Sequence, residues 1–228
     1  MKWIAILLLM TGCAIAPGVP MGDNYMGAKY MRDPLGEEKA PDNDPLIRTD
    51  AFDCTTFVET VMAGGDVSNL NQIRYKDGKI DFMNRNHFIE SDWLANNKNR
   101  VENVSSQFGK TVTRHLTIDK ATWMKKVHGI DADIAPVKTS IEYVPYKNLG
   151  DIDNERVMIV LFISANSKSL DTIGTELAVT HMGLLLPGGT VLRHASSAAG
   201  HVVDADFKKY SDRRRLMGEQ GVAFIEIK

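Results

Sequence analysis

The sequence predicts an α+β fold in which an N-terminal helix packs on a central antiparallel sheet. Residues 53–62 carry apolar side chains at three- and four-residue steps, which is the period of a helix that buries one face. Residues 157–163 form a continuous apolar run of strand length, typical of a buried central strand. Residues 177–197 hold two further apolar runs separated by Pro187-Gly188-Gly189, which indicates an antiparallel hairpin.

Length and composition favour a single domain. The chain has 228 residues, 25% of them charged, and a formal net charge of −2. This length allows one large core, and no internal linker or repeat divides it, so residues 46–228 are predicted to form one domain. The balanced charge gives no indication of a nucleic-acid partner. Residues 17–45 are rich in Pro, Gly, Asp and Asn, which predicts a tether or an arm that wraps around the domain.

The first residues are typical of an export signal. Residues 1–16 contain Lys2, a short apolar run and then small residues, and the run is too short to span a membrane as a helix. Met10-Thr11-Gly12-Cys13 resembles a bacterial lipoprotein cleavage box, in which the cysteine is acylated and becomes the first residue. We therefore expect export to the periplasm or outer cell envelope, with a membrane anchor through lipid on Cys13.

Cys54 is the first candidate for chemistry. The chain has two cysteines, so loss of Cys13 to a lipid would leave Cys54 as a free thiol in an oxidising compartment, where catalysis is the usual explanation. Asp53 is a good N-cap residue, which places Cys54 in the first helical turn. There the helix dipole favours the thiolate. The alternative is a small buried thiol that packs the start of a helix.

Two histidines are the candidate partners of this thiol. If 187–189 is a three-residue loop, His181 faces position 195, and a bulge of one residue would place its ring beside that of His194. A thiolate nucleophile needs a base, and the base needs a group that orients it, so Cys54, His181 and His194 fit these roles in order. The alternatives are satisfied core histidines or a mononuclear metal site. No carboxylate lies at ligand-like spacing to either histidine, so neither a metal nor another cofactor is predicted.

A polar segment offers a candidate substrate-binding wall. It contains Asn84, Arg85, His87 and Trp93, and a short helix is predicted around residues 88–94. Arg85 could donate a bidentate pair of hydrogen bonds to a carboxylate, and Trp93 could present a flat apolar face. The alternative is a turn with solvated side chains.

The remaining elements follow from local patterns. Apolar residues on both sides of Asp77-Gly78 predict a hairpin over residues 73–82. The other predictions are a strand over 110–118, a helix from Asp119 to Gly129, a strand over 141–146, a helix over 204–215 and an edge strand over 222–227.

The motifs together resemble a known family. Asp53-Cys54-Thr55-Thr56-Phe57-Val58, His181-Met182-Gly183 and Leu192-Arg193-His194-Ala195-Ser196 look like the NlpC-type cell-wall cysteine hydrolases. The resemblance spans residues 46–228 and implies a papain-like fold with Cys54 as nucleophile, His181 as general base and His194 as the orienting residue. Residues 84–94 resemble the N-acetylmuramoyl-L-alanine amidase-like branch of that superfamily.

The resemblance implies a metal-independent peptidoglycan hydrolase. Its substrates would be peptidoglycan or muropeptide fragments, and the bond cleaved would be the amide between N-acetylmuramic acid and L-alanine. Two alternatives stay open: a D-glutamyl–diamino acid endopeptidase of the same superfamily, and a non-catalytic lipoprotein that binds muropeptides on the same scaffold.

Overall fold

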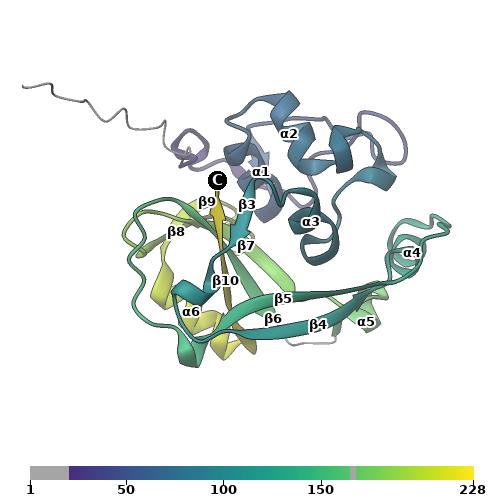
Figure 1. Ribbon diagram of the computed structural model, residues 1–228. Coiled ribbons are helices and arrows are strands. Elements are labelled where there is room, and N and C mark those ends of the chain that lie inside the picture. Colours follow the sequence, from purple (N-terminus) through teal and green to yellow (C-terminus); the bar gives the residue numbers. More distant parts are fainter. Residues whose placement is uncertain (1–20, 165–167) are drawn as a thin grey trace, which may run out of the picture.

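A large, mainly antiparallel sheet forms the centre of the molecule (Figure 1). The computed structural model describes residues 21–164 and 168–228, so the predicted export segment and Cys13 lie outside the described residues. The strand order is β2-β1-β9-β8-β7-β6-β10-β5-β4, with β3 pairing with β10. The predicted combination of helices with a large central sheet is confirmed.

The bounds of the elements are as follows. The strands are β1 (Lys29–Tyr30), β2 (Ala51–Phe52), β3 (Val101–Asn103), β4 (Val112–Ile118), β5 (Val137–Pro145), β6 (Met158–Ser164), β7 (Val179–Leu185), β8 (Val191–Ser196), β9 (His201–Asp206) and β10 (Glu219–Ile227). The helices are α1 (Cys54–Met62), α2 (Val67–Arg74), α3 (Leu94–Asn96), α4 (Lys120–Trp123), α5 (Lys168–Ile173) and α6 (Phe207–Leu216). A π-helical turn, Ile89–Trp93, precedes α3, and another, Met124–His128, extends α4.

Strand β6 is the centre of the sheet, as predicted. All of its residues are buried, and it pairs antiparallel with β7 on one side and β10 on the other. The prediction that residues 222–227 form an edge strand is wrong, because β10 lies between β6 and β5. Residues 222–225 are completely buried, and such an apolar run suits an inner strand as well as the last strand of a chain.

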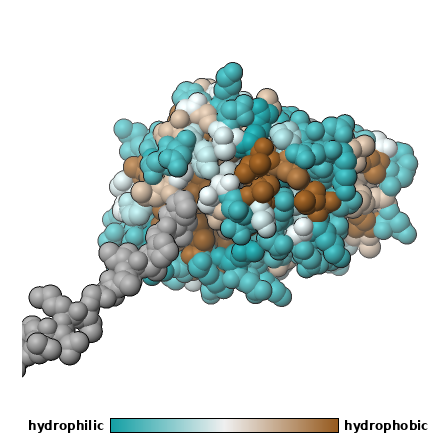
Figure 2. All heavy atoms as spheres, turned by 90° about the horizontal axis from the view of Figure 1, so that it is seen from above, coloured by the Kyte–Doolittle hydropathy of each residue, from teal (hydrophilic) through white to brown (hydrophobic). Residues whose placement is uncertain are grey.

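Helices cover both faces of the sheet. One apolar core, which includes Phe57, Trp93 and Ile159, lies between the sheet and the layer of α1 and α2. A second core, which includes Phe162 and Phe207, lies against α6 on the other face. Figure 1 shows α1, α2 and α3 above the sheet and α6 below it. Seen from the side of α1 and α2, the surface is mainly hydrophilic with a local apolar area (Figure 2).

Two local predictions need correction. The hairpin over residues 73–82 is wrong: α2 continues to Arg74, and Lys76–Gly78 is a 3-10 turn with Asp77 at φ 55° and Gly78 at φ 68°. Asp-Gly does adopt the left-handed turn conformation, but Leu70 and Ile73 before it pack at helical spacing. The helix predicted over 204–215 begins at Phe207, because Asp206 is its N-cap and residues 201–206 form β9.

The helix that follows Asp119 is confirmed, with Gly129 in the left-handed conformation at its end. Strand β4 is confirmed over 112–118, whereas β5 begins at Val137, before the predicted start at residue 141, and runs on to Pro145. Among the described residues, no helix is both long and apolar enough to cross a membrane.

Residues 21–45 pack against the domain. Strand β1 pairs with β2 and β9, and the Leu35 side chain is completely buried in the core. Side chains of α2 and the following residue hold the backbone beside Leu35: Arg74 donates to the Leu35 carbonyl and the Tyr75 hydroxyl donates to the Gly36 carbonyl.

Candidate active site

Cys54 is the first residue of α1, where the sequence predicts it. Asp53 caps the helix: its Oδ1 accepts from the Thr56 amide at 2.8 Å, and the Thr56 hydroxyl accepts from the Asp53 amide at 3.0 Å. This reciprocal capping box fixes the first turn of the helix. Helix α1 packs against β7 and β8, the strands that carry His181 and His194.

The thiol of Cys54 is protonated at neutral pH. Burial, and to a smaller extent the nearby Asp53 carboxylate, raise its pKa to about 11. Hydrogen bonds from the Met182 backbone amide and the Thr55 hydroxyl lower the thiol pKa, but they do not offset the increase caused by burial. The expectation that the helix dipole favours the thiolate therefore needs correction, because desolvation of the buried charge outweighs it.

The two histidines lie side by side. Nε2 of His181 and Nδ1 of His194 are 2.8 Å apart, and the rings are nearly perpendicular at 81°. The register differs from the prediction by one residue: Leu184 pairs with Arg193, so the hairpin loop contains four residues, 187–190. A Cβ at Gly183 would lie 2.9 Å from the Cβ of His194, so this close approach requires glycine.

Both imidazoles are neutral at pH 7. Burial lowers the pKa of His181 well below its usual value, and the neighbouring His194 and Arg214 add to the effect. Burial, Arg214 and Arg213 lower the pKa of His194 to about 4. Within residues 21–164 and 168–228, no hydrogen bond joins the Cys54 sulfur to either ring, and its polar neighbours are Met182 and Thr55. The structure thus joins the two histidines and places the thiol beside the residue that follows His181.

The raised thiol pKa gives a testable expectation. The rate of Cys54 alkylation by iodoacetamide should rise roughly tenfold per pH unit from pH 7 to 10, because thiolate is the reactive species. Intact-mass analysis after timed exposure, in a Cys13→Ser background, measures this rate. A Cys54→Ser variant is the control for other reactive groups. A rate that is already constant below pH 8 would contradict a neutral thiol and indicate a thiolate–imidazolium pair.

A pocket of about 220 Å³ adjoins the start of α1. Its lining includes Asp33, Asp53, Thr55, Asn86, His87 and Trp123. A larger pocket of about 650 Å³ lies between α6 and residues 146–152, and its lining contains none of the predicted site residues. In the described part of the chain, no group of three or more His, Cys, Asp or Glu side chains is arranged to hold a metal ion.

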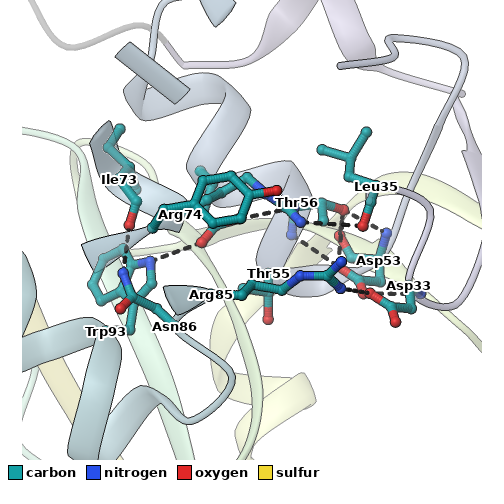
Figure 3. A network of polar contacts seen from close by, with 12 residues as sticks. Asp33, Leu35, Asp53, Thr55, Thr56, Ile73, Arg74, Arg85, Asn86 and Trp93 are labelled. Carbon is teal, nitrogen blue, oxygen red and sulfur yellow. Dashed lines mark hydrogen bonds and ion pairs between the residues drawn. The ribbon is translucent and has the colours of Figure 1, made fainter. Parts of the chain in front are cut away.

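Arg85 is occupied by the protein itself. Its guanidinium forms a bidentate pair with Glu37 at 2.7 Å and contacts Asp42 at 2.7 Å and Asp33 at 3.3 Å. Figure 3 shows Arg85 pointing toward Asp33, which lies next to Asp53, the N-cap residue of α1. Arg85 lines the pocket, but it cannot clamp a substrate carboxylate without releasing these partners. In this arrangement Arg85 holds residues 33–42 against the domain, and its substrate role stays a prediction.

Trp93, predicted to present a flat face to substrate, lies in the apolar core. Its side chain is completely buried, and its Nε1 donates to the buried Glu59 carboxylate at 2.9 Å. The carboxyl group of Glu59 has a pKa raised to about 7, chiefly by burial. The tryptophan that does line the pocket is Trp123, and nothing in the sequence marks its place beside the start of α1.

The other two predicted wall residues differ in position. His87 lines the pocket, packs on Trp123 with ring centroids 4.7 Å apart and shares a hydrogen bond of 2.8 Å with the Phe82 carbonyl. Asn84 ends a 3-10 turn and is not among the residues that line the pocket. Asn86, two residues further along, does line the pocket, and its side-chain amide donates to the Ile73 carbonyl at 2.9 Å (Figure 3).

One family model and several solved structures are similar to this chain. A model of the AmiA-like, N-acetylmuramoyl-L-alanine amidase-like family matches residues 20–218. A crystal structure of a protein from Legionella pneumophila has a TM-score of 0.81 at 24% identity, covering 91% of this chain and 86% of that one. An N-acetylmuramoyl-L-alanine amidase from Bacteroides uniformis has a TM-score of 0.69 at 24% identity, covering 92% of this chain and 100% of that one.

At this identity the two structures establish a similar fold and nothing further. The search of curated proteins gives no match. The family match extends over most of the described residues, including the helix of Cys54 and the strands of both histidines. The chain therefore belongs to the N-acetylmuramoyl-L-alanine amidase-like family.

Proposed function

We propose that this protein is a peptidoglycan hydrolase with a papain-like Cys54–His181–His194 triad. The observation that carries the proposal is the 2.8 Å contact between the buried imidazole of His194 and the half-buried imidazole of His181, on strands that pack against the helix that begins with Cys54. Two facing histidines in a core are costly, since each adds polar atoms that need partners. Membership of the amidase-like family supports the same assignment.

The contact between the imidazoles defines their tautomers in this mechanism. If the Nε2–H of His181 donates to Nδ1 of His194, the Nδ1 of His181 keeps its lone pair and can act as the base. His194 then orients the general base, the role of the third member of a triad. Because thiol and imidazoles all start neutral, His181 removes the Cys54 proton during the attack instead of holding a preformed ion pair.

The reaction would proceed as acyl transfer. The Cys54 sulfur attacks the substrate carbonyl, and backbone N–H groups at the start of α1, including that of Cys54, stabilise the oxyanion. His181 protonates the leaving amine, and water then releases the acyl-enzyme. The bond cleaved is the amide between the lactyl carboxyl of N-acetylmuramic acid and L-alanine. The pocket beside Thr55, with His87 and Trp123 in its wall, receives part of the muropeptide.

The site of action follows from the first residues of the sequence. Residues 1–16 would direct export to the periplasm or outer cell envelope, and lipid on Cys13 would anchor the protein to the membrane. Peptidoglycan fragments are present in that compartment, which is consistent with the proposed substrate.

Product masses test the choice of bond. The purified protein is incubated with N-acetylmuramoyl-L-alanyl-D-glutamyl-diamino acid, and the products are identified by mass spectrometry. We expect free N-acetylmuramic acid and a peptide that begins with L-alanine. Release of a muramyl dipeptide would instead identify the endopeptidase, and binding without cleavage would identify a muropeptide-binding protein. Inhibition by EDTA but not by a thiol alkylator would reject the cysteine mechanism.

A further inference from the structure

Arg214 joins three elements directly behind the histidine pair. From α6, its Nε donates to the Glu219 carboxylate on β10 at 2.7 Å, and its Nη2 donates to the Thr180 hydroxyl on β7 at 3.0 Å. The same Nη2 also contacts the second carboxylate oxygen of Glu219, which in turn accepts from the Thr180 hydroxyl. This closed set of hydrogen bonds fixes the position of Thr180 relative to α6 and β10.

Thr180 is the extra residue of a bulge immediately before His181. On β6, Phe162 is the partner of His181 and Ile163 is the partner of Val179, so Thr180 has no counterpart. A bulge interrupts the alternation of side chains and re-aims the residue next to it. The direction of the His181 side chain therefore depends on the geometry that Arg214 and Glu219 impose on Thr180.

Tyr210 provides a second connection between α6 and the pair. Its ring packs edge-on against His194, with centroids 4.8 Å apart, and lies 5.9 Å from the ring of His181. The guanidinium of Arg214 lies 5.8 Å from the centre of the Tyr210 ring and 5.5 Å from that of Phe162. Tyr210 is buried, so the ring cannot turn away from the imidazoles into solvent.

The charges around the pair come from every neighbouring element. Arg213 and Arg214 lie on α6, and both lower the pKa of His194, whereas Asp204 on β9 raises it. Asp204 is itself in a bidentate pair with Arg193, and Glu219 on β10 pairs with Arg214. From α1, Cys54 faces this group of side chains closely enough to affect the pKa of Tyr210.

We propose that Arg214 is a positioning residue, which sets the orientation of the His181–His194 pair through the Thr180 bulge and the Tyr210 ring. The inference deepens the proposed function, and its effect on catalysis rests on that function. Arg214 touches neither imidazole through a hydrogen bond, so its contribution is to hold the strand and the ring that do contact them. The planar guanidinium suits this role because it can bridge Thr180 and Glu219 at once, which the ammonium of lysine cannot do with the same geometry.

The test combines NMR with kinetics in three variants of the full chain. Arg214→Met removes both the positive charge and the guanidinium that bridges Thr180 and Glu219, whereas Arg214→Lys keeps the charge. Arg213→Met is the matched control, because Arg213 also packs on Tyr210 but is exposed. Long-range ¹H–¹⁵N spectra report the tautomer and titration of His181 and His194. Muropeptide cleavage reports kcat and KM, and thermal unfolding reports the fold.

We expect Arg214→Met to raise the pKa of both imidazoles, since a nearby cation is removed, and to alter their tautomer signals. Cleavage should lose roughly tenfold to a hundredfold in kcat with little change in KM, which is the usual cost of a small misplacement of reacting groups. Arg214→Lys should leave the imidazole pKa values close to those of the wild type and still lose kcat. Arg213→Met should leave the tautomers and kcat unchanged.

Unchanged imidazole signals in folded Arg214→Met would overturn the inference, as would wild-type kcat in Arg214→Lys. If Arg214→Met does not fold, Arg214→Lys and Glu219→Gln, which weakens the bridge from the other side, decide the question. The NMR readout needs no substrate. If the wild-type protein proves inactive on muropeptides, the proposed function fails while the positioning of the histidines is still measured.

Discussion

Cys54→Ala should lower muropeptide cleavage by on the order of 10⁴-fold or more, because it removes the group that forms the acyl intermediate. His181→Ala should cause a similar loss. The double variant should be no slower than either single one, since the members of a triad act as a unit. Rates come from mass-spectrometric detection of the freed peptide, with thermal unfolding of each variant to confirm the fold.

Cys13→Ser is the matched control for this experiment. It removes the other cysteine of the sequence and should leave cleavage by the purified protein unchanged. Retained cleavage in Cys54→Ala would reject the nucleophile assignment, even if the amidase product were confirmed. A double variant much slower than either single one would show that Cys54 and His181 act independently.

Arg85→Met should destabilise the fold by about 3–5 kcal/mol, because removing one partner leaves buried carboxylates uncompensated. Glu37 loses its bidentate partner, and Asp42 loses a contact of 2.7 Å. Without the ion pairs of Arg85, residues 33–42 should also move away from the pocket, whose wall includes Asp33. Urea unfolding measures the change. Adding Glu37→Gln should recover part of it, because a buried charge without a partner is removed.

Arg215→Met is the control for loss of an arginine at the surface. Arg215 forms a 3.9 Å pair with Asp212, in which both side chains are more than half exposed, so the change should be below about 1 kcal/mol. If Arg85→Met keeps the stability of the wild type and instead raises KM, Arg85 binds substrate as the sequence suggests. That result would reject the structural role inferred from its three carboxylate partners.

Local patterns account for the parts of this protein that were predicted well. The helix start at Cys54, the central strand β6 and the His181–His194 hairpin each depend on signals within about ten residues: a cap, an apolar run and a turn. Even so, the hairpin register was wrong by one residue, because loop length alone does not determine it. The contact between the imidazoles also depends on Gly183, which lets the strands approach closely.

The sequence says least about residues whose surroundings depend on distant partners. Arg85 and Trp93 have the chemistry of a binding wall, but Arg85 meets carboxylates 43 to 52 positions away in the sequence and Trp93 meets Glu59. The same is true of the thiol: its position at a helix start predicts a low pKa, whereas burial among packed elements is the main cause that raises the pKa to about 11. In the sequence, Arg214 is one of three consecutive arginines in a predicted helix, and only the packing of β7 and β10 against that helix brings Thr180 and Glu219 to it.

The sequence by itself therefore determined the family, the order of most elements and the three residues proposed for catalysis, because short motifs and local periodicity indicate them. The tertiary structure alone decided which polar side chains face the pocket and which form internal ion pairs. It also decided which protonation states the side chains of the site adopt. Those properties depend on burial and on partners far apart in the chain, and the energy of a buried charge is set by both.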